Sequence, residues 1–591
     1  MIPEHAPFTP DQRKSLDAFL ASLDASQRIW LGGFLSAGVG SATAPAAAPA
    51  TKVPLTVLYG TESGNSEELA AQTVKLAKKK GFKPSMKNMA DCVPADLAQV
   101  DNLLVVVSTW GEGDPPEAAE PFYKALMAES VDYSKVKFSV CALGDTSYER
   151  FCETGKQVDA RLAALGGNRV EDRVDCDVDY EEAFNGWVER ALTALAPEPA
   201  AAPLPTTGAG LPVLPGATEY GKKNPFPSEL LDKVLLNGER SKKETWHYEL
   251  SLEGSGMSYE PGDALAVVPL NAPDMVEGIL TASKLSGTEE VEVKGEKKLL
   301  ADALREDLEV TSLSKSILKK LSEVAPSNKL TTLVSDEGKA ELKAYVYGRW
   351  IVDAIQDFAP DGLDPAQLVS LFRKMPPRLY SIASSPLAHP DEVHLTIASV
   401  RYQAHGRERK GVASTYLADL VKKGDQVPIY THKNKNFRLP ASGDTPIIMV
   451  GPGTGIAPFR SFIEHRAETG DTGKNWLFFG DQHYSYDFLY QLEWQDHIKN
   501  GTLHKLDVAF SRDQPEKVYV QDKMRENARE LYAWLEEGAN FYVCGDASRM
   551  ANDVNEALIE IVHQEGNVSR EAAEEYVAKL KKEKRYQRDV Y

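Results

Sequence analysis

The chain has 591 residues, which is too long for a single hydrophobic core and suggests about three or four domains. Its formal charge is -20, from 67 Lys and Arg against 87 Asp and Glu. That balance disfavours binding to nucleic acid or anionic membranes, which requires basic patches. It favours basic protein partners, although an acidic surface that only maintains solubility explains the charge equally well.

Cysteine usage and hydropathy indicate the compartment. The five cysteines form no C-x-x-C pair and no metal-ligand spacing, so we expect reduced thiols, no metal site and a cytoplasmic protein. The first twenty residues are polar and charged, unlike a signal peptide. No run approaches the roughly 20 apolar residues that a membrane span requires, and we therefore expect no membrane association.

Residues 1–50 are expected to form a short helical segment followed by a linker. Thr9, Pro10 and Gln12 provide a capping box and an N1 proline, and a second short helix is expected to end near residue 38. Apolar residues then recur at helical spacing: Leu16, Phe19, Leu20 and Leu23. So small a segment cannot bury this stripe alone. The pattern predicts homo-oligomerisation through the stripe, with docking onto the chain's own body as the alternative.

Residues 51–196 alternate between apolar strands and helices. Strands are predicted at 55–59, 103–107 and 137–143, with a helix over 67–80. This alternation is typical of a doubly wound α/β sheet, whose ligands bind at the carboxyl ends of the strands. Pro- and Ala-rich linkers are expected over 41–51 and 197–216.

Each predicted strand of this domain ends in a loop suited to a flat, phosphorylated ligand. Residues 61–66 offer hydroxyls, an amide and a glycine turn before a helix, which suits a terminal phosphate. Trp110 and Tyr148 follow the next two strands and could sandwich a ring. Either aromatic alone is more often a packing residue, but three suitable loops in succession favour a cofactor site.

The second half of the chain is predicted to contain two further domains. Residues 217–440 read as a β-barrel interrupted by a helical insertion over about 273–372, and residues 441–591 as a second α/β unit. In the barrel, Arg378 offers a guanidinium for a pyrophosphate and Tyr380 an aromatic face. In the α/β unit, Gly451 to Gly455 form a glycine turn between a strand and a helix, which suits another phosphate.

These motifs together resemble the diflavin reductase family, in which a flavodoxin-type FMN domain precedes an FAD-binding barrel and an NADP-binding domain. The resemblance covers nearly the whole chain and is strongest from Arg378 onward. For the first domain it implies FMN bound through Thr61, Glu62, Ser63, Gly64, Asn65 and Ser66, through Ser108, Thr109, Trp110 and Gly111, and through Leu143, Gly144, Asp145, Thr146, Ser147, Tyr148, Glu149, Arg150, Phe151 and Cys152.

For the barrel, the run Arg-Leu-Tyr-Ser-Ile-Ala-Ser-Ser is specific to ferredoxin-reductase-like proteins. The resemblance implies FAD contacts from Arg378, Leu379, Tyr380, Ser381, Thr396, Ile397, Ala398, Tyr402, Gly411, Val412, Ala413, Ser414 and Tyr591. For the last domain it implies NADP contacts from Gly453, Thr454, Ser511, Arg512, Lys517, Val518, Tyr519, Val520, Gln521 and Asp553. Arg512 and Lys517 favour NADPH over NADH, since NAD sites place a carboxylate at the ribose hydroxyl.

The reaction centre is also implied by the resemblance. Ser381, Cys544 and Asp589 would position the nicotinamide against the flavin during hydride transfer, and the terminal Tyr591 would cover the FAD ring until the nicotinamide displaces it. From the residues alone, Cys544 could equally be a small buried hydrophobe.

Within the family, the C-terminal Arg-Tyr-Gln-Arg-Asp-Val-Tyr, the run over 474–480 and the N-terminal helices look like the flavoprotein α-component branch of NADPH-sulfite reductase. The partner would then be the haemoprotein β-component, with sirohaem and an iron-sulfur cluster. An acidic stretch of Glu171, Asp172, Asp175, Asp177 and Asp179 could dock that partner or form a solvated face. A soluble reductase of haem monooxygenases and a non-catalytic redox sensor remain the alternatives.

Overall fold

The computed structural model describes residues 9, 14–15, 18–19, 53–62, 64–111, 113–146, 148, 150–178, 180–196, 220–335 and 337–591. The predicted linkers and almost all of the predicted N-terminal helical segment lie outside these residues. None of the described helices is long and apolar enough to cross a bilayer.

The first domain contains a sheet of strand order β2-β1-β3-β4-β5, with β6 paired to β4. The pairs β1/β3, β3/β4, β4/β5 and β4/β6 are parallel. The strands are β1 (Val53–Gly60), β2 (Phe82–Asn88), β3 (Asn102–Ser108), β4 (Lys137–Leu143), β5 (Asn168–Arg169) and β6 (Val174–Cys176). The helices are α3 (Asn65–Lys79), α4 (Pro94–Leu97), α5 (Glu120–Ala128), α6 (Glu153–Ala164) and α7 (Glu181–Leu195).

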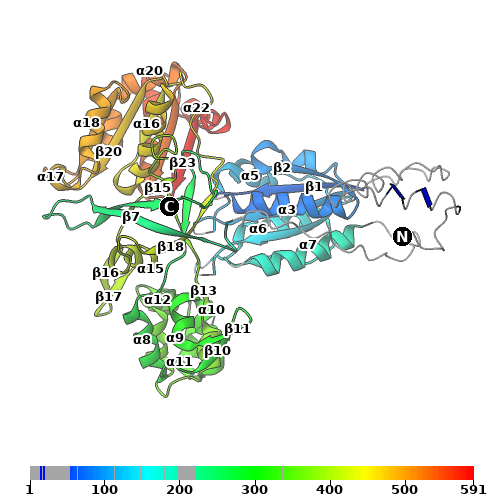
Figure 1. Cartoon of the computed structure of the whole chain (residues 1–591). Coiled ribbons are helices and arrows are strands. Elements are labelled where there is room, and N and C mark those ends of the chain that lie inside the picture. Colours follow the sequence, from blue (N-terminus) through cyan, green and yellow to red (C-terminus); the bar gives the residue numbers. More distant parts are fainter. Residues whose placement is uncertain are drawn as a thin grey trace. The chain divides into compact units, whose positions relative to one another are not determined.

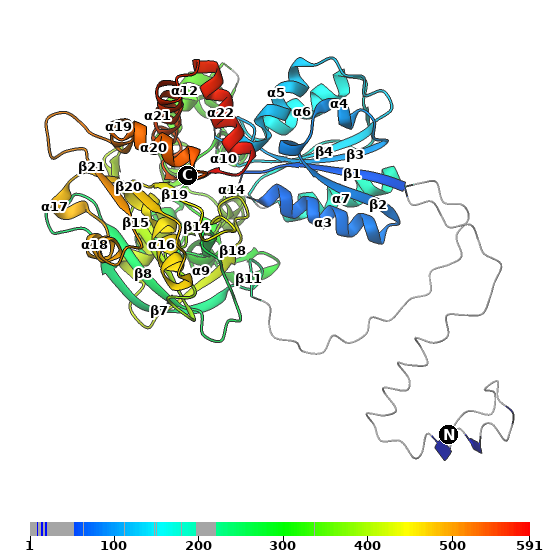
Figure 2. The ribbon, with the colours of Figure 1, turned by 90° about the horizontal axis from the view of Figure 1, so that it is seen from above.

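Helices cover both faces of this sheet because its central strands are apolar on both sides. Phe138 and Val140 of β4 belong to the core beneath α5 and α6. Between them, Ser139 faces the opposite way and accepts a hydrogen bond from Trp187 Nε1 of α7 at 2.7 Å. Figure 2 shows α3 and α7 on one side of the strands and α5 and α6 on the other. The predicted doubly wound fold is therefore confirmed.

The second domain is an antiparallel barrel-like sheet with strand order β14-β9-β18-β7-β8-β15. Its strands are β7 (Phe226–Leu235), β8 (Thr245–Ser251), β9 (Ala264–Val267), β14 (Arg378–Ser381), β15 (Glu392–Ala398) and β18 (Gln426–His432). After β15 come the hairpin β16 (Arg401–Ala404) and β17 (Arg407–Lys410), the short helix α15 (Val412–Thr415) and a π-helical turn, Tyr416–Leu420.

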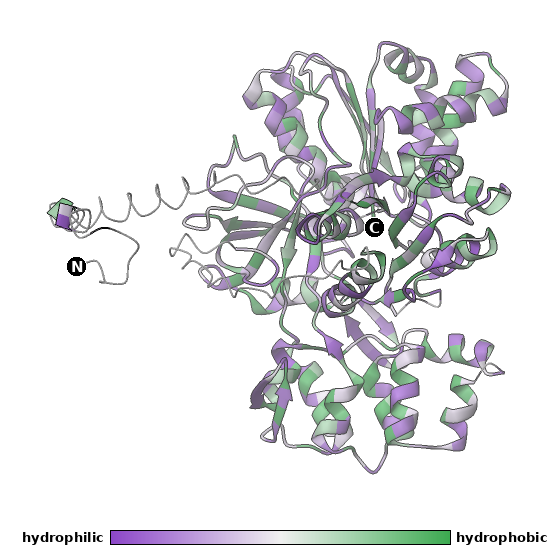
Figure 3. Cartoon of the chain, turned by 90° about the vertical axis from the view of Figure 1, so that its right-hand side faces the viewer, coloured by the Kyte–Doolittle hydropathy of each residue, from purple (hydrophilic) through white to green (hydrophobic). Residues whose placement is uncertain are grey.

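The insertion between β9 and β14 is largely helical, as predicted (Figure 1). Figure 3 shows hydrophobic and hydrophilic residues alternating along its helices, which pack around one apolar core. A β-hairpin was not anticipated: Val291 and Val293 are buried while Glu290 and Glu292 are exposed, and Gly295 (φ 78°) makes the turn. The elements are α8 (Pro273–Ser283), β10 (Glu290–Val293), β11 (Glu296–Leu299), α9 (Leu300–Glu306), β12 (Leu308–Glu309), α10 (Lys315–Val324), α11 (Asn328–Val334), α12 (Lys339–Val346), α13 (Ile351–Phe358), α14 (Pro365–Leu371) and β13 (Arg373–Lys374).

The third domain has a five-stranded parallel sheet of order β21-β20-β19-β22-β23, with a separate apolar core on each face. The strand order reverses at β19, so the crevice at its carboxyl end is the expected ligand position. The strands are β19 (Ile447–Val450), β20 (Asn475–Asp481), β21 (Lys505–Phe510), β22 (Asn540–Gly545) and β23 (Tyr586–Val590). The helices are α16 (Ala457–Thr469), α17 (Tyr484–Asp487), α18 (Gln491–Lys499), α19 (Val520–Glu526), α20 (Ala528–Glu536), α21 (Met550–Glu565) and α22 (Arg570–Lys582).

Candidate functional site

The first phosphate-type turn lies between β1 and the start of α3. Gly64 has φ 90°, which a side chain rarely permits, and its amide donates to Thr61 Oγ1 at 2.9 Å. At the start of the helix, Ser66 Oγ is buried and makes no hydrogen bond within the described part of the chain. An orphaned hydroxyl beside the free amides of a helix N-terminus fits a phosphate group.

The Glu62 side chain has a different task from the rest of this turn. Its carboxylate accepts a hydrogen bond from the amide of Glu117 at 2.9 Å, and burial raises its pKa. Glu62 therefore holds the segment at Glu117 through one carboxylate oxygen, and its side chain also lines the cavity. Ser63 lies outside the described residues.

The loops after β3 and β4 are built to approach each other closely. Thr109 Oγ1 accepts a hydrogen bond from the Thr154 amide at 3.1 Å, which joins the first loop to the start of α6. A side chain at Gly144 would come within 2.8 Å of the Cys152 nitrogen, so glycine is required there. Thr146 is held by Asp177 through its amide (3.0 Å) and its hydroxyl (2.6 Å). Ser147 and Glu149 lie outside the described residues.

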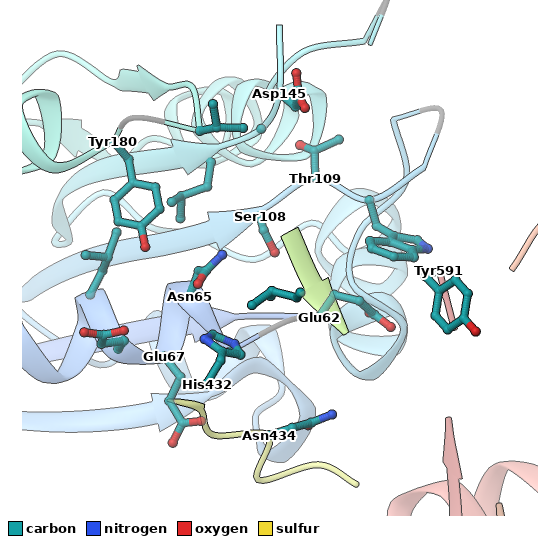
Figure 4. A pocket seen from close by; sticks show the side chains of 18 of the residues that line it. Glu62, Asn65, Glu67, Ser108, Thr109, Asp145, Tyr180, His432, Asn434 and Tyr591 are labelled. Atoms are coloured by element: carbon teal, nitrogen blue, oxygen red, sulfur yellow. The ribbon is translucent and has the colours of Figure 1, made fainter. Parts of the chain in front are cut away.

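The three loops line one cavity of about 1940 Å³. Tyr148 is 51% exposed at its rim, and Trp110 is half-buried, so both rings have open faces suited to stacking. This volume exceeds that of a typical single-ligand pocket. Figure 4 shows the labelled side chains of the cavity: Glu62, Asn65, Glu67, Ser108, Thr109, Asp145, Tyr180, His432, Asn434 and Tyr591. The donors and aromatic rings of the first domain fit FMN.

Arg378 begins β14 and is held by a buried acid. Its guanidinium donates to Glu309 Oε2 at 2.8 Å and to the Pro376 carbonyl at 2.9 Å. Burial opposes ionisation of Glu309, but Arg378 and two hydrogen bonds from Thr311 outweigh it and lower the pKa of that carboxyl. The guanidinium is thus fixed in place as a cation with donors to spare for a pyrophosphate.

The other predicted FAD residues occupy several positions. Gly411 precedes α15, where a side chain would come within 2.7 Å of Ser414 Oγ, so this turn also requires glycine. Tyr402 is 45% exposed on the β16–β17 hairpin. Thr396 is buried on β15 and its hydroxyl bonds to Tyr490 Oη at 2.6 Å. The Thr396 hydroxyl is therefore oriented by Tyr490.

The three predicted reaction residues come together although they are far apart in sequence. Ser381 Oγ, at the end of β14, donates to Asp589 Oδ2 at 2.7 Å. Cys544 Sγ of β22 lies 3.9 Å from the same oxygen, because Cys544 and Asp589 are register partners in the β22/β23 pair. Burial raises the pKa of Asp589 and raises that of the Cys544 thiol well above its usual value, with Asp589 adding to the second shift.

The glycine turn after β19 lies at the predicted crevice. A side chain at Gly455 would lie 2.1 Å from the Cys544 carbonyl oxygen, so this glycine lets the turn Gly453–Ile456 touch the end of β22. The terminal Tyr591 reaches the same turn, with its hydroxyl 2.8 Å from Thr454 Oγ1. The phosphate-type turn, the reaction residues and the chain terminus are therefore adjacent.

The remaining predicted NADP residues lie after β21 and at the start of α19. Arg512 and Lys517 are both exposed, so their charges are accessible to a ribose phosphate. Gln521 donates to Asp553 at 3.3 Å, which links α19 to α21. Ser511 Oγ donates to the Asp481 carbonyl at 3.3 Å and so fixes the end of the loop to β20.

Two residues of the site were missed by the sequence reasoning. Asn434 Nδ2 lies 3.5 Å from Asp589 Oδ1 and lines the cavity, and Glu309 positions Arg378. The polar run after β18 could have drawn attention to Asn434 as a strand-end loop. Glu309 lies 69 residues before Arg378 in the insertion. No local pattern could reveal that pairing.

Comparison with protein families agrees with this order of domains. A flavodoxin model matches residues 57–187, an FAD-binding-domain model residues 219–416, and an oxidoreductase NAD-binding-domain model residues 449–556. The predicted fold class and the cofactors FAD, FMN and NADPH are thereby confirmed.

Curated relatives match along the whole chain. A protein of Bacillus subtilis (strain 168) is 48% identical, covering 99% of both chains; one of Vibrio cholerae O1 El Tor is 42% identical over 99% of this chain and 96% of its own. One of Escherichia coli K12 is 42% identical over 99% of this chain and 98% of its own. Each is named sulfite reductase (NADPH) flavoprotein alpha-component. The chain belongs to this family of NADPH-dependent diflavin oxidoreductases.

Proposed function

We propose that this chain carries electrons from NADPH to a separate haemoprotein, the sulfite reductase β-component, for reduction of sulfite to sulfide. NADPH supplies two electrons as a hydride to FAD, and FMN delivers them singly to the partner. The names of the relatives support this acceptor. Ligands for sirohaem or an iron-sulfur cluster are not expected here, because the five cysteines lack the spacing.

The observation that carries the proposal is the contact of Ser381, Cys544 and Asp589, brought from β14, β22 and β23 to one point. Together they form a small polar group at the junction between the flavin-type barrel and the nucleotide-type crevice. Ser381 and Asp589 would orient the nicotinamide and stabilise the charge that shifts during transfer, while the protonated Cys544 fills space beside them.

Binding is assigned to the surrounding residues. Arg378 would hold the FAD pyrophosphate, Tyr380 would stack on its ring and the Gly411 turn would offer amides. The turn Gly453–Ile456 would receive the NADPH pyrophosphate, with Arg512 and Lys517 on the ribose phosphate. Tyr591, already bonded to Thr454, would cover the flavin until the nicotinamide arrives. The remaining residues named by the resemblance keep the roles predicted above.

Three further assignments belong to the proposal. The segment 1–50 would assemble copies of the chain, as its apolar stripe suggests. The protein would work in the cytoplasm with reduced thiols. The acidic stretch from Glu171 would face the partner; of its members, Glu171 pairs with Arg190 at 2.5 Å, Asp175 with Arg173 at 2.7 Å, and Asp177 holds Thr146. Intramolecular pairing leaves fewer free charges for docking than the sequence suggests.

The test is reconstitution with the partner. The purified chain is analysed for FMN and FAD, then assayed with NADPH and ferricyanide, and finally with the separately purified haemoprotein and sulfite. We expect both flavins in equal amounts and NADPH-dependent sulfide formation. Ferricyanide reduction without sulfide formation would refute the acceptor. Both flavins bound without any turnover would refute the enzyme itself and support a redox sensor.

A further inference from the structure

A histidine and glutamate cluster lies on the barrel, apart from the three residues assigned to the reaction, and its His247 is the register partner of Thr396. His247 and Glu249 are two residues apart on β8, and Glu392 and His394 are two residues apart on the neighbouring β15. His394 lies directly opposite Glu249 in the antiparallel register. Alternate residues share one face of a sheet, so all four side chains project to the same side.

The ligand-type atoms of this cluster lie close to one another. His247 Nε2 is 3.4 Å from Glu249 Oε1, and His394 Nε2 is 3.1 Å from Glu392 Oε2. Within the described residues, His247, Glu249 and His394 place one such atom each within 4.8 Å of the others, and so do His389, Glu392 and His394. Tetrahedral Zn²⁺, with bonds of about 2.1 Å, separates its ligand atoms by about 3.4 Å. The spacing therefore already approximates a coordination shell.

Hydrogen bonds fix the ring of His247 through the nitrogen that would not bind the metal, as is usual for histidine ligands. His247 Nδ1 is 2.9 Å from Tyr490 Oη, which in turn is 2.6 Å from Thr396 Oγ1. Tyr490 can donate to Thr396 and accept the proton of Nδ1, which leaves Nε2 as the lone-pair nitrogen facing Glu249. Both imidazoles are buried, with 6% and 2% of their surface exposed.

Negative charge accumulates around these histidines. Arg460 is the nearby cation, but it already bridges Glu464 (2.8 Å) and Glu493 (2.7 Å). The contact between Arg460 Nη1 and His394 Nδ1 is long, at 3.4 Å, and Arg460 Nη1 also donates to the Ala383 carbonyl at 2.8 Å. Metal binding at His394 Nε2 would give up that long contact and would replace the Nε2–Glu392 hydrogen bond of 3.1 Å.

Two carboxylates lie beside the imidazoles. Glu249 Oε1 lies 3.4 Å from His247 Nε2, and Glu392 Oε2 lies 3.1 Å from His394 Nε2. His389 instead pairs with Glu464, its Nε2 lying 3.3 Å from Glu464 Oε1. A divalent cation held by His247, Glu249 and His394 would neutralise the Glu249 carboxylate.

We propose that His247, Glu249 and His394 bind a divalent transition-metal ion of the Zn²⁺ type, with Glu392 or water as the fourth ligand. Two neutral imidazoles and a carboxylate are a donor set that Zn²⁺ favours. The ion would tie β8 to β15 beside α16, where Arg460 and Glu464 lie. Its role is structural, since all its ligands lie on two neighbouring barrel strands and none is among the residues assigned to the reaction.

The experiment is equilibrium dialysis of the chelator-treated flavoprotein, with FAD and FMN bound, against micromolar Zn²⁺, followed by metal analysis. We expect one Zn²⁺ per chain and a rise in melting temperature on adding Zn²⁺. Loss of an outer-shell partner weakens metal binding about 10- to 100-fold. His247→Gln and Glu249→Gln each remove a direct ligand and should weaken Zn²⁺ binding by more than this. Glu253→Gln, an exposed acid just beyond β8, is the matched control and should bind as the wild type does.

Flavin content and NADPH–ferricyanide activity verify that each variant folds. If His247→Gln loses its flavins, Glu249→Gln decides alone, because that side chain is 34% exposed and the change preserves its size. Absence of bound Zn²⁺ in the wild type would overturn the proposal. So would Zn²⁺ binding that Glu249→Gln leaves unchanged, since the ion would then lie elsewhere.

Discussion

Asp589 organises the junction between the flavin-type and nucleotide-type halves. It accepts from Ser381 at 2.7 Å and lies near Cys544 (3.9 Å) and Asn434 (3.5 Å). Burial raises its pKa above the usual 3.8, and the hydrogen bonds only partly offset this. A carboxylate held in this way can fix the serine hydroxyl and balance charge beside a nicotinamide.

Asp589→Asn is expected to slow flavin reduction by NADPH about 100-fold, through loss of positioning. The wild-type rate needs the ionised carboxylate, so it should fall as the pH drops through the raised pKa, at a higher pH than an exposed aspartate would require. The variant should lack this acidic limb. Stopped-flow flavin absorbance from pH 5 to 8 measures the rate of flavin reduction and its pH dependence. Asp496→Asn, at an exposed position on α18, is the control. A variant that retains the acidic limb would contradict the role of Asp589.

Arg378→Ala is expected to lose FAD and to destabilise the barrel, because it leaves the buried Glu309 carboxylate without its cation. Breaking a fully buried pair costs about 3 kcal/mol, and the 34% exposure of the Arg378 side chain lowers this cost through solvent screening. Because the pKa of Glu309 is lowered in the folded protein, the ion pair stabilises the wild type at neutral pH. This stabilisation is lost as the pH falls through the pKa of Glu309 in the folded state. The measurements are FAD content and denaturant unfolding against pH.

Arg378→Lys is the matched variant for this pair. It keeps a cation near Glu309 and should recover most of the stability, but it cannot bind a pyrophosphate in the bidentate manner of a guanidinium. Full FAD occupancy in Arg378→Ala would refute the cofactor assignment. Unchanged unfolding free energy would refute the role of Glu309.

At the scale of elements, strand ends account for most of the site, which is why much of it could be predicted. The loops after β1, β3 and β4 line one cavity, and the turn after β19 touches the end of β22. Parallel strands place their carboxyl ends together, so local motifs suffice to find such loops. The side-chain directions of Glu62 and Thr396 could not be predicted, because they depend on partners distant in sequence: Glu117 and Tyr490.

The loop between β21 and α19 is expected to select the nucleotide. Exchanging both Arg512 and Lys517 for alanine should raise the KM for NADPH at least about tenfold and leave the KM for NADH nearly unchanged, since only NADPH carries the ribose phosphate. Steady-state ferricyanide reduction with each nucleotide measures this. Lys499, exposed at the end of α18, provides a control alanine variant. Equal loss for both nucleotides would indicate a general effect on the domain instead.

The chain terminus after β23 provides a second test of nucleotide selection. Tyr591→Ala is expected to improve the use of NADH relative to NADPH, because removal of the ring lets either nicotinamide reach the flavin. Tyr591→Phe removes only the hydroxyl that lies 2.8 Å from Thr454 Oγ1 and should behave more like the wild type. The ratio of kcat/KM for the two nucleotides is the readout. An unaltered ratio in Tyr591→Ala would count against the ring-cover role.

At the scale of the molecule, the order of three domains was predictable from alternating periodicity and from three phosphate-type turns. The hairpin β10–β11 was not, because its two short strands lie inside a long helical stretch. The histidine cluster was also invisible in sequence. Its members come from β8 and from a segment about 140 residues later, and only the β8/β15 register unites them. Antiparallel pairing over such distances leaves no local trace.

The central claim is that electrons pass in series from NADPH through two flavins to an external haemoprotein. The most direct measurement is NADPH-dependent sulfide formation with the separate haemoprotein, using the chain before and after selective removal and restoration of FMN. The account predicts that removal of FMN abolishes sulfide formation while FAD is still reduced by NADPH, and that added FMN restores it. Sulfide formation that continues at the same rate without FMN would contradict it.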